Sequence, residues 1–183
     1  MVRGISMKTI PRILLTALCL SALGGCAAQQ NQDKAAATAV ESTPAQQQAA
    51  AVRFVEAFFR QDMNVLQESV ALPFFYNQQA ILAYPQEWSA VLSQLKTQTQ
   101  PADNFSILSV EPLLPGQILA DKPRLWSTFL EYKFEDNRFF LFTVRQPLSA
   151  EMQKKDPQGR RFVDGKILLM VDPATAKVRG FVL

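Results

Sequence analysis

Histidine is absent from the 183 residues of this chain, and cysteine occurs only twice. Without histidine there is no Ser-His-Asp or Cys-His nucleophile system and no His-ligated zinc site. The 7 glycines are scattered, so no glycine-rich loop could cradle a phosphate group. The carboxylates also lack the spacing of a metal site. We therefore predict a protein that is not an enzyme and that needs no metal and no cofactor.

A basic surface is also missing once the N-terminal segment is set aside. The first 25 residues hold Arg3, Lys8 and Arg12 and no acid, so the net charge of +3 belongs to them. The remaining chain balances 16 basic side chains against 16 acidic ones. Nucleic-acid binding requires a clustered positive surface. The sequence therefore predicts no nucleic-acid partner.

An apolar run of 11 residues, 13–23, follows the basic N-terminal residues. It is too short to span a bilayer, which needs about 20 residues, and it is typical of the core of a secretory signal peptide. Leu23, Gly24, Gly25 and Cys26 then resemble the lipobox of bacterial lipoproteins. This resemblance implies cleavage between Gly25 and Cys26, acylation of the Cys26 thiol and a palmitate-type membrane anchor.

The alternative for Cys26 is a free or disulfide-forming cysteine in an ordinary secreted protein. Cys19 lies in the apolar run and is lost with the signal peptide, so Cys26 has no partner in the mature chain. Lipidation explains why it is there. Ala27, rather than Asp, follows the cysteine. By resemblance to bacterial lipoproteins, this implies anchoring in the outer membrane, facing the periplasm.

The composition divides the chain into three segments. Residues 1–25 are the signal peptide, and residues 26–48 are the acylated cysteine and a flexible tether rich in Ala and Gln, which buries too little apolar surface to fold. Residues 49–183 are a single α+β domain. An extension of the next helix is the alternative for the tether, because Ala and Gln are helix formers.

Helices precede strands in the elements that we predict. Thr43-Pro44, with Gln46 three residues after the cap, begins a helix that runs to Gln61. Further helices are expected at 64–72 and from 85 onwards. Strands are expected at 73–76, 80–83, 105–110, 125–134, 138–145, 166–171 and 178–183, the last two joined by a turn at 172–175. This order predicts an α+β fold in which three N-terminal helices pack on a curved, mainly antiparallel sheet.

The order resembles the nuclear transport factor 2-like fold, the cone-shaped α+β family that includes ketosteroid isomerase. Residues 54–59 with Asp62, the Leu72-Pro73-Phe74 step and residues 162–167 carry the resemblance, which covers roughly residues 49–183. It implies an interior between helices and sheet that holds a ligand or, in the enzymes, catalytic side chains. A pilotin-like or other small envelope-lipoprotein architecture is the alternative.

Bulky aromatic side chains gather in an expected hairpin of strands 125–134 and 138–145. Its second strand is apolar on both faces, so one face is the core and the other is expected to be covered by a dimer partner, an envelope protein or lipid. Glu131 is the only acid in the middle of the first strand, where it faces a pocket as a general base, pairs with Arg145 or Lys133, or faces solvent. The candidate pocket or interface residues are Trp126, Phe129, Glu131, Tyr132, Phe139 and Arg145.

The sequence as a whole predicts a lipid-anchored protein with a binding or accessory role. It would be either a scaffold for a homodimeric or envelope partner, through the sheet face, or a holder of an apolar small molecule. Two alternatives stay open. One is a hydrolase or isomerase that works in the interior of the fold, and the other is a secretion or assembly chaperone of the pilotin kind.

Overall fold

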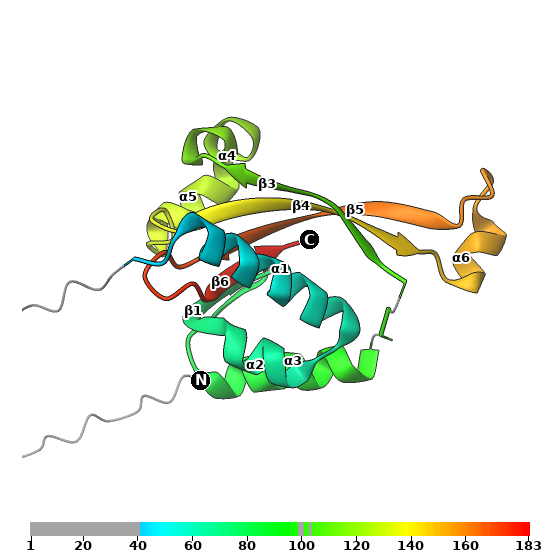
Figure 1. The fold of residues 1–183 in the computed structure, drawn as a ribbon, viewed down its shortest axis with the longest axis horizontal. Coiled ribbons are helices and arrows are strands. Elements are labelled where there is room, and N and C mark those ends of the chain that lie inside the picture. Colours follow the sequence, from blue (N-terminus) through cyan, green and yellow to red (C-terminus); the bar gives the residue numbers. More distant parts are fainter. Residues whose placement is uncertain (1–40, 99–100, 103) are drawn as a thin grey trace, which may run out of the picture. The chain divides into compact units, whose positions relative to one another are not determined.

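The computed structural model describes residues 41–98, 101–102 and 104–183. In these residues it has six helices and one open six-stranded sheet, so the predicted α+β class is confirmed (Figure 1). The predicted signal peptide, with Gly25 and Cys26, lies outside the described residues. The helices are α1 (Pro44–Arg60), α2 (Met63–Ser69), α3 (Pro85–Gln98), α4 (Pro115–Asp121), α5 (Pro123–Glu131) and α6 (Ala150–Lys155). The strands are β1 (Val70–Tyr76), β2 (Ala80–Leu82), β3 (Ser106–Leu113), β4 (Arg138–Pro147), β5 (Phe162–Val171) and β6 (Val178–Val182).

The sheet has the strand order β2-β1-β6-β5-β4-β3. Neighbouring strands are antiparallel except β1 and β6, which are parallel. The predicted hairpins β1–β2 and β5–β6 are both present. β4 and β5 pair over their full length and run on beyond the other strands to α6 (Figure 1).

The predicted hairpin of residues 125–134 and 138–145 is wrong, because its first half is helix α5 and β4 pairs with β3 and β5. Pro123 occupies the first helical turn, where its missing N–H removes no hydrogen bond. Leu125 and Phe129, four residues apart, are both buried on one side of the helix. The chain then turns into β4, and Asn137 Nδ2 donates to the carbonyl oxygen of Phe134 at 2.8 Å across that turn.

Helix α1 begins as predicted. The hydroxyl of Thr43 accepts from the backbone N–H of Gln46 at 3.3 Å, and the Gln46 side chain accepts from the N–H of Thr43 at 2.8 Å. Ser42 donates its hydroxyl hydrogen to the carbonyl oxygen of Pro173 at 2.6 Å, and Gln47 is 3% exposed. The folded unit therefore takes in residues 42–48, which the sequence analysis assigns to the tether.

The second predicted helix begins and ends earlier than expected. Asp62, rather than Asn64, caps α2, and its carboxylate accepts from the N–H of Val65 at 3.1 Å. The helix ends at Ser69 and β1 begins at Val70, so the short strand expected from residue 73 is longer.

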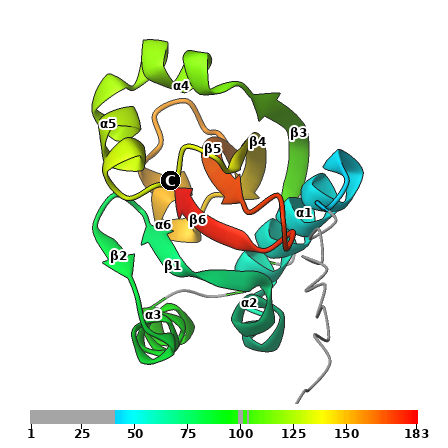
Figure 2. The same cartoon turned by 90° about the vertical axis from the view of Figure 1, so that its left-hand side faces the viewer.

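Helices lie against both faces of the sheet, which curls when it is viewed end on (Figure 2). On one face, which we call the α1 face, lie α1, α2 and α3, whose buried residues Phe54, Leu66 and Trp88 belong to one core cluster. On the opposite face, which we call the α5 face, lie α4 and α5, whose residues Ile118 and Phe129 belong to a second core cluster. Figure 2 shows α2 and α3 side by side, with β1 and β6 between them and α4 and α5. The second face is thus covered by this chain's own helices at one end.

Candidate functional site

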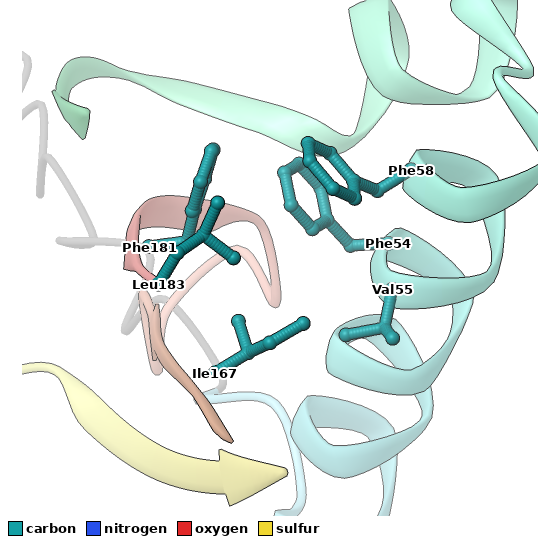
Figure 3. Close-up of a pocket in the computed structure, with 6 residues that line it drawn as sticks. All are labelled: Phe54, Val55, Phe58, Ile167, Phe181 and Leu183. Atoms are coloured by element: carbon teal, nitrogen blue, oxygen red, sulfur yellow. The ribbon is translucent and has the colours of Figure 1, made fainter. Parts of the chain in front are cut away.

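The interior of the α1 face is filled by aromatic side chains. Phe54, Phe74, Trp88 and Phe142 are all buried, and the rings of Phe74 and Trp88 lie 4.7 Å apart. A cavity remains where α1 faces the middle of β5 and the end of β6, but its volume is only about 10 Å³ (Figure 3). Its lining is apolar throughout: Phe54, Val55, Phe58, Ile167, Phe181 and Leu183. This volume holds about one water molecule, so the α1 face has no room there for a ligand.

Three of the predicted site residues meet under helix α5. The rings of Phe129 and Phe139 stack with centroids 5.4 Å apart, and Trp126 lies 6.2 Å from Phe129 and 6.0 Å from Phe139. Phe129 and Phe139 are buried, and Trp126 is half-buried. Phe75 of β1 adds an edge-to-face contact with Phe129 at 5.4 Å. These residues form a core between α5 and the sheet and not an exposed interface.

The other predicted site residues do not join this cluster. Glu131 is the last residue of α5 and Tyr132 is its C-cap, and both are exposed. Glu131 therefore does not lie in the middle of a strand. Arg145 pairs with Asp164 of β5 instead of Glu131, through two hydrogen bonds of 2.8 and 2.9 Å. These hydrogen bonds, with the charge of Arg145, lower the pKa of the Asp164 carboxyl.

On the α5 face, residues paired across neighbouring strands form rows. With distance from α5 along the strands, these rows change from apolar to polar. Under α5 the row is Leu113, Phe139, Met170 and Gly180; the next row is Glu111, Leu141, Leu168 and Val182. The third row is Ser109, Thr143 and Lys166, and Arg145 pairs with Asp164 beyond it. The uncovered part of this face therefore carries polar side chains up to Arg145 and Asp164, and the next pair on it is Pro147 with the exposed Phe162.

A cleft of about 160 Å³ lies at the boundary between the apolar and polar rows, beside helix α4. Its apolar floor consists of Leu113, Ile118, Leu141, Leu168, Val182 and Leu183. Its polar lining comes from Gln117, Asp121, Lys122 and Lys166. We call this space the α4 cleft.

The two lysines of the α4 cleft have no partner among the described residues. Neither the Lys122 nor the Lys166 ammonium group makes a hydrogen bond or an ion pair there, and both side chains are exposed. Asp121 is the one acidic side chain among the lining residues, and Leu183, the last residue of the sequence, also lines the cleft. Glu111 lies in the same row as Leu141 and accepts a hydrogen bond from Ser109 at 3.2 Å. The cleft thus combines an apolar floor with a polar rim that carries charges of both signs.

Sequence reasoning missed this cleft because α5 was predicted as a strand. Two signals for the helices were available, since Pro115 and Pro123 both stand where a helix begins and Leu125 and Phe129 have helical spacing. If both helices had been predicted between β3 and β4, we would have expected them to cover part of this face of the sheet.

A second exposed feature is the arm, which consists of the distal ends of β4 and β5 with α6 and the residues between them, 145–164 (Figure 1). Three apolar side chains are exposed on it: Met152 at 58%, Phe162 at 48% and Val163 at 37%. Asp156 pairs with Arg160 at 2.9 Å, which lowers the pKa of that carboxyl.

Within the described part of the chain, no three His, Cys, Asp or Glu residues come together as a metal site. Nor does any helix there have the length and apolar character needed to cross a bilayer. No protein-family model matches this chain, and no curated protein is significantly similar to it in sequence.

Proposed function

We propose that this chain is a lipid-anchored accessory protein of a bacterial envelope, acylated at Cys26 and facing the periplasm from the outer membrane. The observation that carries the proposal is Leu23-Gly24-Gly25-Cys26 directly after an apolar run of signal-peptide length. Two or three acyl chains give stable anchoring, whereas one chain gives only marginal binding.

The architecture supports the assignment to the nuclear transport factor 2-like type. Helices α1, α2 and α3 contribute to one core on one face of a curved, mainly antiparallel sheet. That is the arrangement which the resemblance implies. Helices α4 and α5, between β3 and β4, are an addition to the expected order.

The filled interior favours binding at the surface over holding an apolar molecule inside the cone. A hydrolase or isomerase of this fold needs a carboxylate that faces an interior pocket. The interior cavity beside α1 has about 10 Å³ and an apolar lining, and Glu131 is exposed on α5. Both observations weigh against catalysis in the cone.

Metabolic labelling with an alkyne analogue of palmitate tests the anchor in a bacterial host. The wild-type protein should carry the label and sediment with outer-membrane vesicles, and Cys26→Ser should lose both properties. Cys19→Ser is the matched control and should keep the label, because residue 19 leaves with the signal peptide. Ala27→Asp should move the labelled protein to the inner membrane. Label retained by Cys26→Ser would contradict the proposal.

A secretion or assembly chaperone is the second candidate, and the exposed Met152, Phe162 and Val163 of the arm favour it. Exposed apolar side chains are a feature of protein-binding surfaces, and all three of these belong to the arm. A photo-reactive amino acid at Phe162 should crosslink an envelope protein in living cells, and one at Lys96 of α3 should not. Equal crosslinking at both positions would argue against a role for the arm.

A further inference from the structure

We propose that the open edge of β5 binds an extended segment of another protein as an added β-strand. β5 spans Phe162–Val171, but β6 pairs only with residues 168–171, so no strand of the described chain lies beside residues 162–166 on that side (Figure 1). We call residues 162–166 the β5 edge. The proposal rests on the chaperone candidate and deepens it, because it states how the arm holds a partner. It does not depend on acylation of Cys26.

The backbone of the β5 edge directs hydrogen-bonding groups away from β4 at every second residue. In an antiparallel pair, opposite residues alternate between pairs that exchange hydrogen bonds and pairs that do not. The N–H of Leu148 donates to the carbonyl oxygen of Arg161 at 2.9 Å, so that pair is hydrogen-bonded. The alternation then directs the N–H and C=O groups of Phe162, Asp164 and Lys166 to the outer side. Within the described chain these groups have no hydrogen-bond partner.

The end of β6 leaves the space beside the β5 edge open to a strand. Val182 lies opposite Leu168, and the next residue, Leu183, donates its N–H to Asn77 Oδ1 at 3.0 Å, on the β1 side. A strand that continues the line of β6 would therefore lie beside residues 162–166. A row of alternating N–H and C=O groups matches the spacing of another polypeptide backbone, so the occupant is an extended peptide segment.

The other open edges of the described sheet carry features that oppose strand addition. β2 is short, with three residues. The outer edge of β3 is interrupted by a bulge between Ile107 and Ser109 and by Pro112, which has no N–H. On β4, Pro147 lies shortly beyond Arg145, the last residue that pairs with β3. The β5 edge contains no proline, and its pairing with β4 is regular.

The side chains of the β5 edge set the pattern of the partner strand. Val163 and Gly165 lie on the α1 face, and the neighbouring Ile167 lines the apolar cavity beside α1. Asp164 and Lys166 lie on the α5 face and are polar. A Cβ at Gly165 would meet no atom within 4 Å, so an aromatic side chain of the partner has room beside it. We therefore expect a segment in which apolar and polar residues alternate, with an aromatic residue opposite Gly165.

Titration of a peptide with this pattern into the full-length chain carrying Cys26→Ser tests strand addition. The probe is acetyl-Thr-Phe-Thr-Val-Thr-Lys-amide. The backbone amide resonances of Phe162, Asp164 and Lys166 should shift saturably, and the hydrogen exchange of these amides should slow. Methylation of the peptide nitrogens of the two Thr residues that flank Phe removes N–H groups that face β5, so it should abolish binding. Methylation of the Phe and Val nitrogens is the matched control and should leave the affinity unchanged. No saturable shift, or equal binding of both methylated peptides, would overturn the proposal.

Two substitutions at residue 166 locate the binding at the β5 edge. Lys166→Pro removes an outward N–H group without removing a hydrogen bond to β4, so it should abolish peptide binding while circular dichroism reports an intact fold. Lys166→Gln keeps the N–H and should bind as the wild type does. If Lys166→Pro unfolds, the two methylated peptides decide. A photo-crosslink from residue 162 to an envelope protein that persists in a folded Lys166→Pro variant would overturn strand addition and leave the chaperone candidate standing.

Discussion

Replacement of Gly180 by alanine should destabilise the fold strongly, because β6 passes between two bulky side chains at this residue. Phe75 of β1 and Met170 of β5 lie opposite Gly180 in the register. A Cβ at residue 180 would lie 2.6 Å from Phe75 Cβ and 2.7 Å from the Phe75 carbonyl oxygen, and it would also meet Met170 Cε. The terminal methyl group of Met170 can move away, but the backbone of β1 fixes the positions of Phe75 Cβ and the Phe75 carbonyl oxygen.

The expected loss is at the upper end of the range for overpacked cores, about 3 kcal/mol, or about 10 °C in Tm for a domain of this size. Displacement of Phe75 also disturbs its edge-to-face contact with Phe129, so the near-ultraviolet circular dichroism should weaken. Urea unfolding followed by tryptophan fluorescence measures the free energy of unfolding. Gly165→Ala is the matched control on β5, where a Cβ meets no atom within 4 Å. A Gly180→Ala variant as stable as the Gly165→Ala variant would refute the reasoning.

Three further predictions concern single contacts. Thr43→Ala should lower the free energy of unfolding by about 1 kcal/mol, as loss of a helix cap does, and a thermal melt checks it. Phe129→Ala should lower it by about 3–5 kcal/mol; a smaller loss would mean that Phe129 is not a core residue. Arg145→Gln should return the pKa of Asp164 upward to its ordinary value in an NMR titration. Because the native pKa is lowered, the stability due to this pair is present above roughly pH 4 and is lost as the pH falls through the native pKa.

Local signals in the sequence predict the elements that local chemistry determines. The cap at Thr43, the turn at residues 172–175 and the proline at 85 each act within a few residues, and the predicted elements beside them are present. The Asp172 carboxylate, for example, accepts from the backbone N–H of Ala174 at 2.9 Å within the turn.

The elements that the sequence does not predict depend on contacts between distant residues. In residues 123–134, Trp126, Tyr132 and Phe134 would share one face of a strand, while Leu125 and Phe129 follow the helical spacing. Packing of Phe129 on Phe139 and Phe75 selects the helix. The α4 cleft exists only because these residues are helical. No local sequence pattern predicts on which rows of the sheet α4 and α5 lie.

The position of β6 in the sheet has a consequence for how this chain folds. β6 lies between β1 and β5, and Phe75 pairs with Gly180 across more than one hundred residues. Contacts of such long separation close late, because the loop entropy is lost before the pairing compensates for it. Until residues 178–182 are in place, β1 and β2 have no strand joining them to β3, β4 and β5. Folding of this domain therefore waits for nearly the whole chain, because the sheet cannot close before its last strand is available.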